Sequence, residues 1–472
     1  MRKILLASAA MVGAAGLAHA QPTAMPMAPT QGMTAVQSAG NPPAGVNNSN
    51  NMAAAATKGS VANPTPGSVV IHFNGRVFSG VFASWGSGDK SGSSKINPVA
   101  LSTYARLYTG VDGMTTGGMR YGGAIEVREN FAAVTSSTAG TGASGHSSGQ
   151  TLFVRRAFGY VASEQLGILR VGQADGLISL YDNGITTFQF LPTGNLNGGD
   201  TEVAPAGIAN VPFANFAVAG NEYDNSKLVY LSPSFSGFDF GLQWAPNTSN
   251  GYAPCTVAAT GCANLSSSST AIDGSRILNQ TAVGARYKGV LGGVDILAYG
   301  VYMFSGHANY NGPAIAARSA TALASTGGTG KFENLSFGNI GLAGTYAGLT
   351  VGGNVNFGNV NNQGGLKPTG GASQVAVVAG VKYATGPLTV GVTGEIIDHQ
   401  GAPQLVGLSQ RHEVGISGGA SYTLAPGLVV WAEYVYQQRH QGGFNFATST
   451  AGSAAFNDVK SHALGLGATV YW

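Results

Sequence analysis

A two-residue alternation begins near Val69, continues to the C-terminus, and constrains this chain more than any other feature. In residues 238–244, for example, Phe, Phe, Leu and Trp alternate with Asp, Gly and Gln. A period of two residues puts every second side chain on the same face of a β-strand. The pattern therefore predicts an all-β chain whose strands have one apolar face and one face of small, polar or charged residues.

The alternation recurs in sixteen segments, and the spacing between them is regular. The segments are residues 69–85, 100–111, 118–131, 150–163, 166–174, 226–233, 236–247, 277–289, 291–304, 334–347, 349–358, 374–385, 387–397, 412–424, 427–438 and 460–472. From the fourth segment onward, tight turns alternate with long connections. The tight turns are predicted at 164–165, 233–236, 289–290, 348, 386 and 425–426. The long connections are predicted at 175–225, 248–276, 305–333, 359–373, 398–411 and 439–459.

Short turns at one end and long loops at the other are typical of an up-and-down barrel in an outer membrane. Hydrocarbon offers the backbone no hydrogen bonds, so strands that cross it must close into a ring. A ring of sixteen strands is too wide for side chains to fill, which predicts a water-filled lumen. Only 9% of the residues are charged, against about 25% in soluble domains. Residues 68–472 are therefore expected to form a sixteen-stranded antiparallel transmembrane β-barrel with long external loops.

The N-terminal region carries the features of export. Arg2 and Lys3 precede an apolar stretch over 4–17, and Ala18-His19-Ala20 fits a small-x-small cleavage site. Residues 1–20 are therefore predicted to be a secretory signal peptide, cleaved before Gln21. Residues 21–67 are rich in Pro, Ala, Asn, Met and Gly and show no sustained period, which indicates a flexible segment.

The only two cysteines, Cys255 and Cys262, lie seven positions apart in a polar stretch. In an oxidising compartment this spacing favours a small disulfide loop, with free thiols as the alternative. No His, Asp or Glu lies between them, and the eight His of the chain show no metal-ligand spacing. We expect neither a metal site nor a cofactor, although bridging of loop acids by calcium stays open.

Two strings that resemble enzyme motifs lie in the wrong context. Residues 145–149 fit G-x-S-x-G and residues 140–145 fit G-x-G-x-x-G, but both lie in one Ser- and Gly-rich loop. The first motif needs a strand-to-helix elbow and the second needs a preceding strand and a following helix. The formal net charge is only +3, and it falls to +1 without Arg2 and Lys3. Nucleic-acid binding needs a clustered basic surface, so this low charge argues against it. The sequence predicts a protein that is not an enzyme.

Several stretches resemble the trimeric porins of the Gram-negative outer membrane. The most specific is Tyr-Leu-Ser-Pro-Ser-Phe-Ser-Gly-Phe at 230–238, which resembles a turn of that family. Further matches are 74–76, 155–158 followed by 167–172, 283–287, and the aromatic C-terminus. Gln173 stands where the family usually has Arg, and Trp472 stands where Phe is common. The 21–67 segment and the low overall charge also depart from the family pattern.

The resemblance implies that the third long loop, 175–225, folds into the lumen and narrows it. This loop contains acidic residues but neither Lys nor Arg. The acids expected at the constriction are Asp175, Asp182, Asp200 and Glu202. Acids that face a basic wall would create a transverse field, which favours dipolar, hydrophilic solutes.

The basic wall is expected on the early strands, where alternation places arginines on the polar face. The arginines predicted to line the constriction are Arg76, Arg106, Arg120, Arg128 and Arg170. Arg155 and Arg156 are adjacent, so alternation predicts that they point to opposite sides of the sheet. Alternation gives the face of each residue but not its depth in the channel.

Two classes of function fit these features. The first is an outer-membrane porin, a homotrimer in contact with outer-membrane lipid, through which small hydrophilic solutes and ions diffuse passively. A substrate-specific sugar channel is a variant that needs a ladder of lumenal aromatic residues, for which Tyr104, Tyr108 and Trp431 are the candidates. The second class is a non-channel barrel that acts as a surface enzyme or an adhesin.

Overall fold

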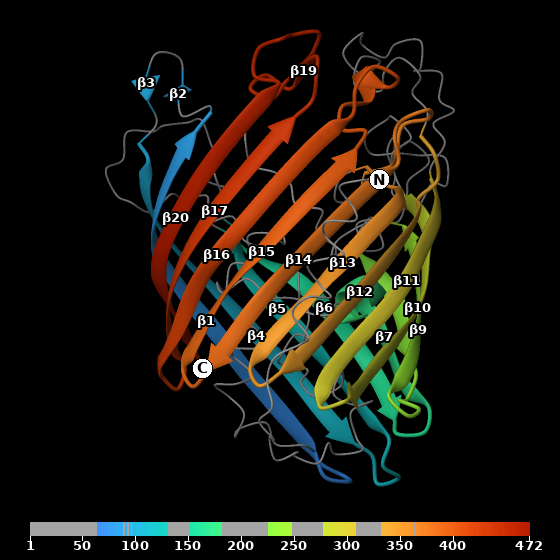
Figure 1. Cartoon of the computed structure of the whole chain (residues 1–472). Helices are drawn as coiled ribbons and strands as arrows, with labels where there is room; N and C mark the ends of the chain where they lie inside the picture. The colour runs from blue at the N-terminus through green and yellow to red at the C-terminus, as the bar shows by residue number, and fades with distance from the viewer. Residues whose placement is uncertain are drawn as a thin grey trace. The chain divides into compact units, whose positions relative to one another are not determined.

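A computed structural model describes residues 64–87, 90–91, 94–95, 97–130, 151–181, 225–247, 277–307, 332–361 and 365–472. Sixteen strands form a closed barrel, in which each strand pairs antiparallel with its neighbours along the chain (Figure 1). The strands are β1 (Val69–Gly86), β4 (Val99–Met114), β5 (Arg120–Asn130), β6 (Thr151–Ser163), β7 (Gly167–Gln173), β8 (Ser226–Leu231), β9 (Phe238–Asn247), β10 (Ile277–Leu291), β11 (Val294–His307), β12 (Ser336–Tyr346), β13 (Leu349–Asn359), β14 (Gln374–Thr385), β15 (Leu388–His399), β16 (Arg411–Ala425), β17 (Leu428–His440) and β20 (Asp458–Tyr471). The predicted fold and all sixteen predicted strands are confirmed.

A few short elements lie outside the barrel wall. The hairpins β2 (Lys90–Ser91) with β3 (Ser94–Lys95) and β18 (Phe444–Asn445) with β19 (Thr450–Ala451) extend two long connections. The helix α3 (Leu177–Tyr181) opens the third long loop, and η6 (Pro403–Leu405) lies in the connection between β15 and β16. No helix among the described residues is long and apolar enough to cross a membrane.

The barrel closes where β1 pairs with both β20 and β4. Arg76 opposes Tyr471 on one side and Arg106 on the other. The Trp472 amide also donates to the Gly75 carbonyl at 3.2 Å, and a side chain at Gly75 would collide with the indole of Trp472. Closure removes the edges of the sheet, so that its backbone groups find partners within the ring.

Exposure alternates along the strands and separates the two faces of the wall. On β1, Ile71 and Phe73 are 74% and 62% exposed, whereas Arg76 and Phe78 are 1% and 0% exposed. Large apolar side chains therefore cover the outside, and charged side chains lie inside. This arrangement suits a barrel whose outer face contacts lipid and whose inner face lines a lumen.

Short turns join the strands at one end of the barrel, as the sequence predicts, with one correction. The turn expected at 289–290 lies instead at Gly292-Gly293, because β10 continues to Leu291. Both glycines have positive φ, 60° and 83°. A two-residue hairpin of type I′, which matches the strand twist, needs positive φ at both central positions. Glycine adopts positive φ without steric cost, so the Gly292-Gly293 pair suits this turn.

Some expectations lie outside the described residues. These are the signal peptide, residues 21–63 of the flexible segment, and the two cysteines Cys255 and Cys262. The long connections 131–150, 182–224, 248–276 and 308–331 also lie outside them. The domain boundaries and the disulfide stay predictions.

Candidate functional site

Three arginines form a row across the lumenal face of neighbouring strands. Arg76 on β1 opposes Arg106 on β4, and Arg106 opposes Arg128 on β5. Directly opposed residues have Cβ atoms about 4.5–5.5 Å apart, and like charges there are destabilising. All three are at most 8% exposed, so water does little to relieve the repulsion. A row of like charges on one face of the wall is a candidate functional feature.

A β-bulge adds two further arginines to this face. Glu126 opposes Arg156, but Val127 opposes Val154, so that Arg155 is the extra residue of β6. Arg155 and Arg156 are both 3% exposed and both contact Glu126. The expectation that they point to opposite sides is therefore wrong, because a bulge interrupts the two-residue alternation on which it depends.

Two carboxylates bind this arginine cluster. Glu126 pairs with Arg128, with Arg155 at 2.8 Å and with Arg156 at 2.9 Å. Asp175, just after β7, pairs with Arg156 at 2.6 Å and lies 3.6 Å from Arg155. Asp175 is fully buried, so the first residues of the third loop lie against the lumenal wall.

The lumenal side of this sector remains strongly basic. Among the side chains that the structure describes on β1, β4–β7 and the start of the third loop, the buried charged ones are seven arginines and three acids. The arginines are Arg76, Arg106, Arg120, Arg128, Arg155, Arg156 and Arg170, and the acids are Asp112, Glu126 and Asp175. The net positive charge attracts anions, and low-dielectric surroundings strengthen that attraction.

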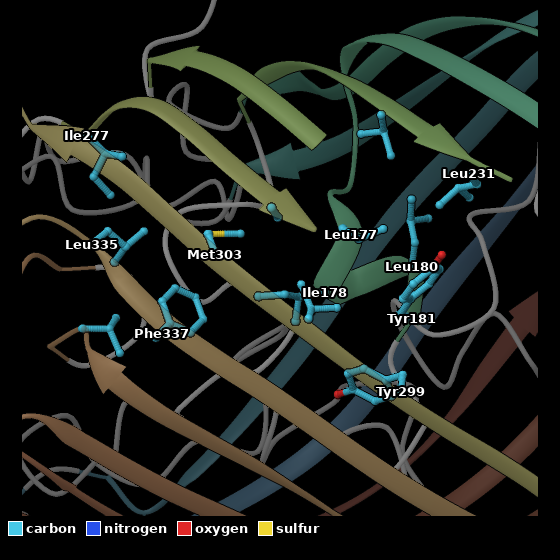
Figure 2. Packing of buried hydrophobic residues seen from close by; sticks show 14 of the residues in the cluster. Leu177, Ile178, Leu180, Tyr181, Leu231, Ile277, Tyr299, Met303, Leu335 and Phe337 are labelled. Atoms are coloured by element: carbon cyan, nitrogen blue, oxygen red, sulfur yellow. The ribbon is translucent and has the colours of Figure 1, made fainter. Parts of the chain in front are cut away.

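The helix α3 anchors the third loop inside the barrel. Leu177 lies over Gly241 and Gly284, which oppose each other on β9 and β10. A Cβ on Gly241 would lie 2.3 Å from Leu177 Cδ1, so the glycine makes room for the helix. The Leu177 amide donates to Gln243 Oε1 at 2.6 Å. Figure 2 shows the side chains of α3 packed toward lumenal residues such as Met303 and Phe337.

Polar contacts hold the other end of α3. Arg286 donates to the Leu180 carbonyl at 3.1 Å, pairs with Asp239 at 2.9 Å, and lies 4.6 Å over the ring of Tyr181. Burial, and then the charge of Asp239, raises the pKa of the Tyr181 phenol well above its ordinary value. The phenol is therefore neutral at physiological pH and acts as packing for the helix.

Lys227 on β8 joins the two ends of the third loop. Its Nζ donates to the Ala174 carbonyl at 2.5 Å and to the Asn225 carbonyl at 2.8 Å. Ala174 precedes the loop, and Asn225 is its last residue before β8. A single buried ammonium therefore fixes where the loop leaves the wall and where it returns.

Acidic residues line a second sector of the lumenal face, on β15, β16 and β17. Glu395, Glu413 and Glu433 are each at most 3% exposed. Glu413 pairs with Arg439 at 2.8 Å and lies 3.4 Å from His399, and Glu433 accepts a hydrogen bond from Ser417. Within the described part of the chain, neither carboxylate oxygen of Glu395 has a hydrogen-bond partner. The lumen therefore has a basic sector and, on β15–β17, an acidic sector in which Arg411 and Arg439 offset part of the glutamate charge.

The structure places some predicted site residues and leaves others outside its described part. Arg76, Arg106, Arg120, Arg128 and Arg170 are all buried on the lumenal side, and Arg170 lies 4.2 Å over the ring of Phe158. Asp175 contacts the arginine cluster. Asp182, Asp200 and Glu202 lie outside the described residues. The position of these residues at the narrowest point stays a prediction.

Sequence reasoning missed several residues of the site. Glu126, Lys227, Glu395, Glu413 and Glu433 share the lumenal face with the predicted arginines. Strand alternation was the available signal, since Glu395 lies between Gly394 and Ile396, and Val414 follows Glu413. The described residues contain no group of three or more His, Cys, Asp or Glu that could hold a metal ion.

A sixteen-stranded antiparallel barrel with an apolar outside and a charged inside defines an outer-membrane channel. A family model described as "Gram-negative porin" matches residues 7–442. The chain belongs to this family, and it is an outer-membrane porin through which small hydrophilic solutes diffuse passively. The comparison with curated proteins gives no match.

Solved structures of three outer-membrane proteins are among those similar to this chain. The anion-selective porin from Comamonas acidovorans is 12% identical, with 86% of this chain and 100% of that chain covered and a TM-score of 0.49. The channel DcaP of Acinetobacter baumannii is 14% identical, with 87% and 100% covered and a TM-score of 0.47. OmpT of Vibrio cholerae, in a trimer form, is 12% identical, with 86% and 100% covered and a TM-score of 0.47.

Proposed function

We propose that this porin passes small anions in preference to cations, and that the lumenal arginines set the preference. The observation that carries the proposal is the opposed row of Arg76, Arg106 and Arg128 on the lumenal face. A row of fixed positive charge raises the local concentration of anions and lowers that of cations. Glu126 pairs with Arg128 beside this row, and Asp175 pairs with Arg156.

The acidic sector gives the proposed channel a transverse field. Glu433 lies on β17, which β20 separates from β1 and the basic sector. Glu395 lies on β15, which β16 separates from β17. Asp182, Asp200 and Glu202 are proposed to add negative charge from the third loop. Such a field orients water and dipolar solutes across the passage, so hydrophilic solutes enter more easily than apolar ones.

The proposal includes a homotrimer in outer-membrane lipid and no catalytic step. Membership of the porin family supports the trimer. The exposed apolar belt, which includes Ile71, Phe73 and Leu101, suits contact with lipid or with a neighbouring protomer. Among the described residues, the lumenal acids and arginines neutralise one another in part and hold no metal-binding group.

Reversal potential across a planar bilayer under a KCl gradient tests the anion preference. The parent protein should give an anion-selective potential, and Arg76→Gln should shift it toward cations, most strongly at low salt. Lys460→Gln is the matched control, because it removes the same charge from an exposed position on β20. If Arg76→Gln and Lys460→Gln both match the parent at low salt, the arginine row does not set selectivity.

A further inference from the structure

Two histidines oppose each other on the outer face of the wall, at the end of the barrel that carries the long connections. His412 lies near the start of β16 and His440 ends β17, and the two are direct partners in the sheet. The side chain of His412 is 49% exposed, and His440 is also exposed. Their neighbours Glu413 and Arg439 pair with each other on the lumenal face. The two imidazoles are therefore separate from the lumenal charges, with Cβ atoms about 4.5–5.5 Å apart, as for any directly opposed pair.

An aspartate flanks the histidine pair on each side. Asp398 on β15 opposes His412, and Asp458 on β20 opposes His440. The row of two acids and two histidines crosses β15, β16, β17 and β20, which lie side by side in Figure 1. All four residues are exposed to solvent. Register thus brings together two imidazoles and two carboxylates that are far apart in the sequence.

The aspartates are placed to orient the rings and to attract a cation. Asp398 Oδ1 lies 2.5 Å from His412 Nδ1, a contact that favours the neutral tautomer with its proton on Nδ1 and its lone pair on Nε2. Histidines that bind a metal through one nitrogen commonly donate the other N–H to a carboxylate in this way. Gln438 Nε2 donates to Asp458 at 2.9 Å and holds that carboxylate in the row. Lys460, two positions after Asp458 on the same face, offsets only one of the two negative charges.

We propose that His412 and His440 together bind a Zn²⁺ ion on the outer rim of the barrel, with Asp398 as a positioning residue. Imidazole nitrogen is a ligand that Zn²⁺ prefers, at about 2.0–2.1 Å, whereas Ca²⁺ and Mg²⁺ prefer oxygen. Two ring nitrogens from directly opposed residues can reach one ion, and water completes its coordination. The site does not depend on the anion preference, because the lumenal arginines take no part in it.

The bound ion would link two strands where they enter long connections. His412 follows the connection 400–410 between β15 and β16, and His440 precedes the connection 441–457 between β17 and β20. An ion that binds the folded chain and not the unfolded one stabilises the folded state. Zn²⁺ should therefore raise the thermal unfolding temperature of the parent channel, and it should not do so when either histidine is replaced.

Calorimetric titration of the purified, folded channel with ZnCl₂ tests the proposal. His412→Ala and His440→Ala should each remove one bound Zn²⁺ per protomer, and Asp398→Asn should weaken its binding about 10–100-fold. Binding should also fall below about pH 6.5, where imidazoles become protonated. His462→Ala is the matched control, since His462 also lies on the outer face, but its Nδ1 is 2.6 Å from the Tyr434 hydroxyl and no histidine opposes it. This variant should bind Zn²⁺ as the parent does.

The possible results decide between this site and the alternatives. If the parent binds no Zn²⁺, or if His412→Ala and His440→Ala bind it as the parent does, the site is wrong. Binding of Ca²⁺ as tight as that of Zn²⁺, retained when both histidines are replaced, would assign the cation to the aspartates and also overturn it. Heat-modifiable mobility in SDS shows that each variant is folded, so that lost binding is attributed to the site. The KCl reversal potential tests the anion preference independently, because either measurement can fail while the other stands.

Discussion

Arg155 and Arg156 are adjacent in the chain, yet both enter the lumen and both face Asp175. The bulge on β6 makes this possible, because it inserts Arg155 without moving Arg156 off the lumenal face. Asp175 belongs to the start of the third loop. The bulge therefore serves as an attachment point, at which two charges of the wall hold the loop against it.

Removal of the Asp175 charge should loosen this attachment. Asp175→Asn is expected to destabilise the barrel by about 3–5 kcal/mol, as found when one partner of a buried ion pair is removed. It should also make the channel more anion-selective, because Arg155 and Arg156 keep their charge. Chemical unfolding and reversal potential measure the two effects. Asp295→Asn, at an exposed position on β11, is the control and should change neither; a stable and unaltered Asp175→Asn would contradict the attachment.

The glycine beneath Leu177 should be sensitive to a single added methyl group. Gly241→Ala places a Cβ 2.3 Å from Leu177 Cδ1 and 2.9 Å from Tyr181 Oη, which forces α3 away from the wall. Overpacking of this kind costs about 1–3 kcal/mol. Thermal unfolding should occur at a lower temperature, and single-channel conductance should become noisier. Gly300→Ala on β11 is the control, since a Cβ there meets no atom within 4 Å. Equal behaviour of the two variants would show that α3 does not depend on the glycine.

Tyr181 should make the stability of the barrel fall at alkaline pH. Its phenol has a raised pKa in the folded protein, whereas an unfolded phenol ionises near pH 10. The folded state then holds a proton that the unfolded state has lost. The stability that the raised pKa of Tyr181 contributes is therefore complete below about pH 10 and declines as the pH rises above it. Urea unfolding between pH 9 and 11.5 measures the decline, which Tyr181→Phe should reduce. Tyr383→Phe, at a partly exposed ring, is the control and should leave the decline unchanged.

The cysteine pair stays a sequence prediction with a direct test. Export to an oxidising compartment favours a bond between Cys255 and Cys262. Peptide mapping without reductant should recover the two cysteines in one linked peptide. Recovery of both in alkylated form, after labelling under denaturing conditions, would show free thiols instead.

The predicted cleavage site has an equally direct test. If the signal peptide ends at Ala20, the intact mass of protein from purified outer membranes should correspond to a chain that begins at Gln21. Protein in that fraction that retains residues 1–20 would contradict the prediction.

Local pattern was sufficient for the strands and for the faces of most charged residues. Alternation placed Arg76, Arg106 and Arg128 on the lumenal face, and the structure has them there. This works because the direction of a side chain in a regular strand depends only on its position in a two-residue period. The same rule fails at Arg155, where a bulge inserts a residue, and at the turn before β11, where glycine conformation decides the length of the hairpin.

Contacts between distant segments could be decided only by the closed barrel. Register alone brings Gly241 to oppose Gly284 beneath Leu177, and ring closure alone brings Trp431 across Gly467 to Phe78. The sequence by itself determined how many strands form and which side chains face water. The tertiary structure decided which lumenal residues meet. Strand register and closure are properties of the whole ring, and the alternation within a single strand does not encode them.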